Sequence, residues 1–374
     1  PLISAMSADT GIRVSDFGLF LFLQFVAFAV ASFAGGAVRE RLGVSNQTLI
    51  SLGLVVIAVS FVVGSLLLRS WLSLVLWVIP LGLSGGSVET FSSIEIAALS
   101  DTDSSKNLCL SQVFYSLGAF AAPQLVYVCL GLGLNWNGVF LVFALFSGLI
   151  MALFLFLAQK RFAPAKAEGQ ITSEAGPADG GRDQSNLLFY FLMLLMLCYV
   201  TLESLSAAWL AYVFEQEFTM GARNASLVLA GFWGGMVFGR FFIVLLPKRF
   251  TLWPTMLITT LLLLSSALAL WVFEPLPVKV VAVIALGASA GPMWPVIVMT
   301  SSSTFVSEGK TAVIIGMGAL GFASGPVVGS LLIESGLSVY HAGQVMLAGL
   351  VVVITYSAFS ISARRGKVLN RQGS

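Results

Sequence analysis

The sequence predicts an all-α membrane protein, and three observations lead to this prediction. First, 58% of the 374 residues are hydrophobic and only 10% are charged, whereas soluble domains carry about 25% charged residues. Second, the mean hydropathy of +0.97 exceeds what a soluble fold of this length could bury. Third, the apolar residues form continuous runs of helical length, not the alternating segments of about ten residues that are typical of membrane β-barrels.

Hydropathy divides the chain into eleven expected spanning helices. Each is long enough to supply the roughly 20 apolar residues that cross the hydrocarbon core. Residues 1–8 are also apolar, and we interpret them as the last turns of a first helix that is largely missing from this sequence. The alternative is an eleven-span protein with a short external start. The expected spans are 17–38, 46–68, 71–99, 107–131, 134–159, 186–213, 222–247, 252–273, 277–303, 309–334 and 338–363.

The Lys and Arg residues predict how these spans are oriented. If the loop 38–41 is cytoplasmic, alternation of the spans puts 15 of the 19 Lys and Arg residues on the cytoplasmic side, as the positive-inside rule requires. The C-terminus is then cytoplasmic. We therefore expect a multi-pass protein of the cell membrane, most simply the bacterial inner membrane. The net charge of +2 is too small to indicate a nucleic-acid partner.

A polar segment divides the chain into two halves. Residues 160–185 are rich in Gly, Ala, Pro and charged residues, which is typical of a flexible linker, and the orientation makes this linker cytoplasmic. We therefore expect an N-terminal bundle over 1–159, with the stump of helix 1 and helices 2–6, and a C-terminal bundle over 186–374, with helices 7–12. An internal repeat supports this division, because residues 82–89 (Gly-Leu-Ser-Gly-Gly-Ser-Val-Glu) parallel residues 287–294 (Gly-Ala-Ser-Ala-Gly-Pro-Met-Trp). Two six-helix halves in parallel repeat resemble the plan of the major facilitator superfamily.

The loop after the first expected span has a charged motif. Residues 36–43 read Gly-Ala-Val-Arg-Glu-Arg-Leu-Gly and resemble the superfamily signature Gly-x-Leu-x-Asp-Arg-x-Gly. We expect the glycine to allow close helix approach, and Arg39, Glu40 and Arg41 to form a gating network that holds one transport state. Arg240 belongs to a degenerate counterpart in the second half. The alternative is that these basic residues only determine topology.

Three of the 17 acidic residues lie within expected spans: Glu89, Glu95 and Glu203. A charge at the bilayer centre costs roughly 2.5–3.5 kcal/mol on insertion scales, so such residues are functional candidates. Glu95 lies near the cytoplasmic end, where it could snorkel or cap. We expect Glu89 and Glu203 to couple transport to protons or sodium, because a carboxylate can bind either. The alternative is that both only hydrogen-bond to neighbouring helices. Small residues on the Glu89 face are expected to leave space beside it: Gly82, Gly85, Gly86 and Ser93.

Rare residue types exclude several kinds of chemistry. The one histidine, His341, lies at the expected outer end of the last span, so we expect a carboxylate to carry any proton at mid-membrane. The three cysteines form no Cys-x-x-Cys motif, and we expect no metal site and no cofactor. No P-loop is present, so we expect no ATP-driven pump. No nucleophile–base pair is visible, so we do not expect an enzyme.

Polar and aromatic side chains are placed at helical spacing around the intramembrane acids. Gln112 and Tyr115 share one helix face, as do Tyr199 and Glu203. Amides, hydroxyls and indole rings near a buried acid are what a sugar requires, because its hydroxyls hydrogen-bond and its apolar face stacks on aromatic rings. For each tryptophan the alternative is helix packing. The candidate substrate-binding residues are Glu89, Gln112, Tyr115, Tyr199, Glu203, Trp209, Trp233 and Trp294.

Two of the expected spans are interrupted by Gly and Pro. Residues 291–295 read Gly-Pro-Met-Trp-Pro, and the span 309–334 contains a series of glycines with Pro326. Proline kinks helices, and glycine permits either bending or close packing. The sequence leaves both roles open.

Several of these segments resemble the fucose/galactose/glucose symporter branch of the superfamily. The resemblance rests on Val-Glu-Thr at 88–90, Gln-Val-Phe-Tyr-Ser-Leu-Gly at 112–118, Tyr-Val-Thr-Leu-Glu at 199–203, Phe-Trp-Gly-Gly at 232–235 and Met-Trp-Pro at 293–295. It implies that Glu89 contacts the sugar and couples to the cation, and that Gln112 binds the sugar.

The sequence therefore predicts a secondary active transporter that moves a monosaccharide or similar small polar solute by alternating access, coupled to protons or sodium. The expected partners are the solute, the ion and the lipid bilayer, and we expect a monomer. An exporter of an amphipathic compound or lysolipid on the same fold is the alternative, because 12% of the residues are aromatic.

Overall fold

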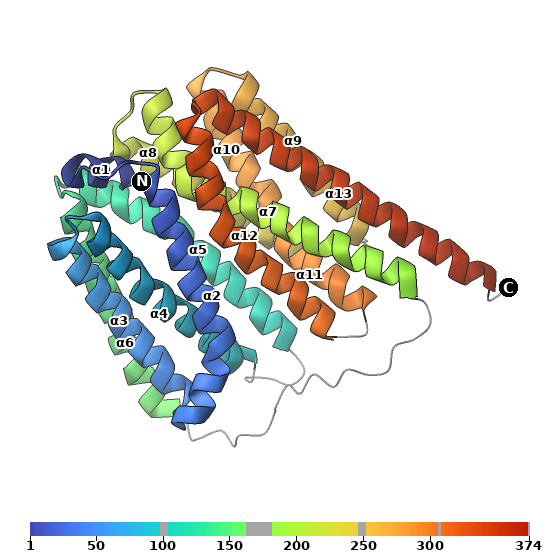
Figure 1. Ribbon diagram of the computed structural model, residues 1–374, viewed down its shortest axis with the longest axis horizontal. Coiled ribbons are helices and arrows are strands. Elements are labelled where there is room, and N and C mark those ends of the chain that lie inside the picture. The colour runs from blue at the N-terminus through green and yellow to red at the C-terminus, as the bar shows by residue number, and fades with distance from the viewer. Residues whose placement is uncertain (98–103, 162–181, 246–251, 306–307, 373–374) are drawn as a thin grey trace. The chain divides into compact units, whose positions relative to one another are not determined.

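The computed structural model describes residues 1–97, 104–161, 182–245, 252–305 and 308–372. Within these ranges the regular secondary structure consists of thirteen α-helices (Figure 1). The helices fall into two compact units. Unit 1 comprises Pro1–Gln170 with Thr219–Leu227, and unit 2 comprises Ile171–Phe218 with Val228–Ser374. Most of the expected linker, residues 162–181, lies outside the described residues.

Unit 1 is built on a core of three long helices. Helix α4 packs against both α2 and α3, and α3 also packs against α6. The helix ends follow from local chemistry: Ser45 caps α3 by accepting a hydrogen bond from the Thr48 amide, and Gly43 ends α2 in the left-handed conformation, with φ of 62°. The helices of unit 1 are α1 (Ile3–Thr10), α2 (Asp16–Leu42), α3 (Asn46–Leu67), α4 (Trp71–Ala97), α5 (Ser104–Gly131) and α6 (Trp136–Arg161).

Unit 2 is organised around α7, which packs along most of α12 and also contacts α13. The span expected over 277–303 is divided by Gly291-Pro292 into α10 and α11, which confirms the predicted interruption. The helices of unit 2 are α7 (Arg182–Glu217), α8 (Ala222–Leu245), whose first residues belong to unit 1, α9 (Leu252–Val272), α10 (Leu276–Ala290), α11 (Met293–Thr304), α12 (Glu308–Glu334) and α13 (Leu337–Gln372).

The prediction of eleven spans is confirmed. Eleven described segments are long and apolar enough to cross a membrane, and their limits agree with the expected spans within a few residues. Two helices run further than expected: α7 continues to Glu217, and α13 continues to Gln372. Polar residues that favour helices extend both beyond the apolar part, which hydropathy alone does not detect.

The internal repeat is confirmed by equivalent glycine contacts in the two units. A Cβ atom on Gly82 or Gly86 of α4 would overlap backbone carbonyls of α2, at Gln24 and Phe28. In unit 2, a Cβ atom on Gly287 or Gly291 at the α10 end would overlap backbone carbonyls of α8, at Phe232 and Met236. The fourth span of each half therefore packs backbone-to-backbone on the second.

These contacts correct two expectations about glycines. Gly82 and Gly86 do not leave space beside Glu89, because α2 fills the space over both. In the loop motif, a Cβ atom on Gly36 would meet nothing within 4 Å, so Gly36 does not mediate close helix approach. The second glycine of the motif, Gly43, is required instead by its positive φ at the end of α2.

Candidate functional site

Glu203 and Arg240 are two buried ionic residues in the core of unit 2. Tyr199 lies one helical turn before Glu203 on α7, and its hydroxyl donates a hydrogen bond to Glu203 Oε2. Nη2 of Arg240, from α8, lies 3.9 Å from Glu203 Oε1. The exposed fractions of Tyr199, Glu203 and Arg240 are 0%, 2% and 7%. The three side chains therefore form one network inside an apolar bundle.

The two carboxylate oxygens of Glu203 differ. Oε2 accepts from Tyr199, whereas Oε1 is buried and has no hydrogen-bond partner among the described residues. A buried acceptor without a partner costs free energy, and more so when it is charged. Oε1 therefore has an open position that a proton, a cation or a hydroxyl of a solute would satisfy.

Arg240 makes contacts to two neighbouring helices. Its Nε donates to the Gly291 carbonyl at 3.4 Å, so it joins α8 to the break between α10 and α11 as well as to Glu203. Sequence reasoning assigned Glu203 and Arg240 to separate roles and missed their pairing. The available signal was charge balance, because a cation inside an apolar span needs an acid nearby.

The three tryptophan candidates have different surroundings. Trp209 is fully buried, and its Nε1–H donates to the Pro326 carbonyl at 2.9 Å. These contacts favour the alternative role for Trp209, which is helix packing rather than substrate binding. Trp233 is 8% exposed, and Trp294 is half-buried. Of the three, Trp294 presents the most surface on which a ring could stack.

The candidates of unit 1 lie on the surface of that unit. Glu89 and Tyr115 are exposed, and Gln112 is half-buried. Glu89 lies at the edge of the glycine-lined contact between α4 and α2 rather than inside it. A carboxylate exposed within an apolar span is costly beside lipid, which favours a polar path along α4.

The loop motif takes part in a chain of hydrogen bonds. Arg39 Nη1 donates to Asn46 Oδ1 at 2.9 Å, and Asn46 Nδ2 donates to Glu95 Oε1 at 2.8 Å. This chain joins α2, α3 and α4, and it gives Glu95 a partner that sequence reasoning did not identify. Glu40 and Arg41 are exposed.

Comparison of the sequence with models of protein families identifies the family of this chain. The model described as "Major Facilitator Superfamily" matches residues 1–329. The chain belongs to the major facilitator superfamily. Its fold class is therefore the one that the two-bundle plan predicted, and the protein is a membrane transporter.

Solved structures of other superfamily transporters have the same fold. The nucleoside transporter NupG matches with a TM-score of 0.70 at 14% identity, over 96% of this chain and 93% of that one. The human organic anion transporter MFSD10 (TETRAN) matches with a TM-score of 0.62 at 20% identity, over 94% of this chain and 88% of that one. A search of curated protein sequences found no significant match.

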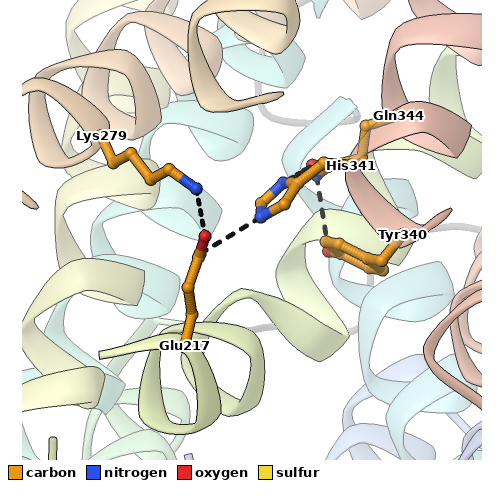
Figure 2. A network of polar contacts seen from close by, with 5 residues as sticks. All are labelled: Glu217, Lys279, Tyr340, His341 and Gln344. Atoms are coloured by element: carbon orange, nitrogen blue, oxygen red, sulfur yellow. Dashed lines mark hydrogen bonds and ion pairs between the residues drawn. The ribbon is translucent and has the colours of Figure 1, made fainter. Parts of the chain in front are cut away.

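A second polar network of this superfamily member was missed by sequence reasoning. It lies at the end of unit 2 where α7 ends and α10 and α13 begin, and it contains Glu217, Lys279 and His341 (Figure 2). Lys279 and His341 are each only 3% exposed. The sequence placed both near the membrane surface, and nothing in their local pattern indicated burial. No group of three His, Cys, Asp or Glu side chains in the described part of the chain could hold a metal ion.

Proposed function

We propose that this transporter is a secondary active carrier that moves a monosaccharide or similar small polar solute by alternating access, driven by a proton or sodium gradient. The observation that carries the proposal is the open acceptor position on Glu203 Oε1, beside Arg240 in the core of unit 2. A carboxylate that can gain or lose a cation without leaving its bundle is suited to ion coupling. Glu89 is the proposed second coupling residue.

The polar solute is supported by the exposed polar residues of unit 1. Glu89 is exposed within the apolar span of α4, and Tyr115 is exposed on α5. Because a carboxylate is expensive in hydrocarbon, these side chains favour a water-filled path and a solute with hydroxyls. The resemblance of residues 88–90 and 112–118 to the fucose/galactose/glucose symporters points to the same class, with Gln112 as a sugar-binding residue.

Export of an amphipathic compound or lysolipid is the second candidate. It is favoured by an apolar groove of about 570 Å³ between α3 and α6, a size that would hold an acyl chain. Its lining has no polar group to recognise a head group. The groove is lined by Ala58, Val59, Val62, Leu141, Ala144, Leu145, Gly148 and Leu149.

The proposed orientation puts the C-terminus in the cytoplasm, because that arrangement collects 15 of the 19 Lys and Arg residues on one side. The end of unit 2 that holds Glu217, Lys279 and His341 then faces outward. A single cysteine introduced near Ser374, labelled in intact cells and in inverted vesicles, tests this orientation. Labelling should occur only in the inverted vesicles.

Transport assays in proteoliposomes test the function directly. The panel contains D-glucose, L-fucose, a nucleoside, an organic anion and a lysolipid, each with a pH gradient, a sodium gradient or neither. We expect accumulation of a sugar or similar polar solute that depends on one gradient. Transport of the lysolipid alone would replace the first proposal by the second.

The Glu203→Gln variant tests the coupling role. We expect it to lose gradient-driven accumulation while it still exchanges labelled for unlabelled solute, because the amide keeps the shape of the site but binds no proton. Retained exchange also shows that the variant is folded. Glu274→Gln, at an exposed acid outside the spans, is the matched control and should behave as the unmodified protein. Undiminished uphill uptake by Glu203→Gln would remove Glu203 from the mechanism.

A further inference from the structure

The ion pair in the core of unit 2 is longer than a hydrogen bond. Nη2 of Arg240 lies 3.9 Å from Glu203 Oε1, and Oε1 has no hydrogen-bond partner among the described residues. Arginine–carboxylate hydrogen bonds are normally about 2.7–2.9 Å long, and they are frequently bidentate. Both side chains are buried, where the attraction between opposite charges is strong. Other contacts must therefore keep the two groups apart.

One restraint acts on the arginine. Its Nε donates to the Gly291 carbonyl at 3.4 Å, at the break between α10 and α11. The backbone of α8 is in contact with the same break, because a Cβ atom on Gly291 would overlap the Met236 carbonyl and lie 3.2 Å from the Arg240 nitrogen. Since the backbone is fixed here, Arg240 can approach Glu203 only by rotation of its side chain.

The second restraint acts on the carboxylate. The hydroxyl of Tyr199, one helical turn before Glu203 on α7, donates to Oε2. This bond fixes the rotation of the carboxylate group, and it occupies the oxygen that Arg240 would need for a bidentate pair. Arg240 also interacts with the same hydroxyl, so the phenol contacts both charged groups.

The helices around this pair supply no competing charge in the part of the chain that the structure describes. Helices α9 and α11 contain no titratable residue, and α12 carries its own only in its first and last turns. Helix α13 has none between His341 and Tyr356, and Lys279 of α10 is paired at the far end of that helix. The separation of Glu203 from Arg240 therefore depends on the two restraints above.

We propose that Tyr199 is a positioning residue for ion coupling, because its hydroxyl prevents Arg240 from closing on the Glu203 carboxylate and so keeps Oε1 open for the ion. This inference rests on the proposed function, since Glu203 is the coupling residue of that function. Tyr199 acts through Glu203 rather than on the solute, which agrees with its exposed fraction of 0%. The alternative is a hydroxyl that only stabilises α7.

Loss of the hydroxyl would change what the ion has to displace. With Tyr199 in place, a proton or sodium ion that binds Oε1 finds that oxygen without a hydrogen-bond donor. Without the hydroxyl, rotation of the Arg240 side chain would give both oxygens of Glu203 a guanidinium donor. The ion would then compete with a bidentate pair, which raises the concentration that it needs.

The Tyr199→Phe variant removes the hydroxyl and keeps the ring. In proteoliposomes, we expect the proton or sodium concentration for half-maximal gradient-driven uptake to rise by about tenfold or more, which is the effect of one hydrogen bond to a charged group. Tyr340→Phe is the matched control and should behave as the unmodified protein. Tyr340 of α13 is also 0% exposed, but its hydroxyl donates to the Leu205 carbonyl rather than to a charged group.

The outcomes for Tyr199→Phe are decisive in each direction. Exchange of labelled for unlabelled solute should be retained, which shows that the variant is folded. An unchanged or lower half-maximal ion concentration would overturn the proposal. Loss of exchange in Tyr199→Phe, with normal exchange in Tyr340→Phe, would show that the hydroxyl serves folding and would overturn it as well.

The Arg240→Lys variant tests whether closure needs the guanidinium group. Lysine is a point charge and cannot bind both carboxylate oxygens in the bidentate geometry. Adding Tyr199→Phe to Arg240→Lys should therefore change the half-maximal ion concentration much less than in the unmodified background. Equal shifts in the two backgrounds would contradict the proposed spacing role.

Thermal unfolding in detergent tests the spacing without any transport. A double-mutant cycle with Arg240→Gln and Glu203→Gln measures how strongly the two charges interact. We expect a larger interaction, as a shift of the unfolding temperature, in the Tyr199→Phe background, where the pair is closed. If the unmodified protein transports no solute but this difference is found, the proposed function fails and the spacing role of Tyr199 stands. If transport is ion-driven but the two cycles agree, the proposal fails and the function stands.

Discussion

The two units bury their membrane-spanning helices to different extents. In unit 1, between 17% and 28% of the residues of each span are buried, whereas five of the six spans in unit 2 have 44% to 61% of their residues buried. The ionic networks follow this division. Glu203 and Arg240 are inside unit 2, whereas Glu89 is on the surface of unit 1.

One pair of related helices explains much of the difference. Residues 117–123 of α5 and 320–326 of α12 share the pattern Leu-Gly-x-x-x-x-Pro. Helix α12 packs along α7, and a Cβ atom on Gly321 would come within 2.7 Å of Val200 Cβ. A Cβ atom on Gly118 of α5 would meet nothing within 4 Å. The same motif is therefore tightly packed at Gly321 of α12 and open at Gly118 of α5.

The largest effect on stability is expected from Arg240→Gln in unit 2. It leaves the Glu203 carboxylate buried without its counter-charge, and breaking such a pair costs about 3–5 kcal/mol. Thermal unfolding in detergent measures the loss. The double variant Arg240→Gln with Glu203→Gln should recover part of it, and the exposed Arg41→Gln of unit 1 should unfold as the unmodified protein does. Equal losses in Arg240→Gln and Arg41→Gln would contradict the contrast between the units.

The glycine pair gives a matched test of intermediate size. Gly321→Ala should destabilise the protein by about 1–3 kcal/mol, because the added methyl group must displace α12 from α7. Gly118→Ala should stabilise it by up to about 1 kcal/mol, because alanine favours helix and the space is open. Opposite shifts of the unfolding temperature are the expected result. A destabilising Gly118→Ala would show that α5 is as tightly packed as α12.

The smallest effect on stability is expected from Glu89→Gln, although we expect its effect on transport to be large. Because Glu89 is exposed on unit 1, its replacement should leave the unfolding temperature nearly unchanged. Gradient-driven accumulation should nevertheless be abolished, with some exchange retained. Uptake assays and thermal unfolding on the same preparation check both statements. Normal uphill uptake would exclude Glu89 from coupling.

The sequence predicted the elements that depend on one helix at a time. Hydropathy located all eleven spans, and the repeated glycines at 82–86 and 287–291 indicated the division into two halves. The hydrogen bond between Tyr199 and Glu203 was predictable because a separation of four residues puts both on one helix face. Proline spacing located the break between α10 and α11.

Contacts between helices could not be predicted from the sequence. Helical periodicity gives the face of a residue but not the partner helix, so the pairing of Glu203 with Arg240 and of Glu217 with Lys279 was missed. Trp209 shows the same limit, since nothing in its own span reveals that the Pro326 carbonyl accepts its N–H. The sequence of an apolar span does not show which of its ends is covered by other helices. The burial of His341 depends on contact among α7, α10 and α13, which no single span reveals.

Helix α10 is short and uninterrupted, and it contacts a different ionic network at each end. Lys279 near its start pairs with Glu217, and the Gly291 carbonyl after its last residue accepts from Arg240. Twelve residues of helix separate the two contacts by about 18 Å. A continuous helix of this length is rigid along its axis, so a displacement at one end is transmitted to the other. Linkage is reciprocal, so weakening the Glu203–Arg240 pair at one end of this helix is expected to affect the Lys279–Glu217 pair at the other.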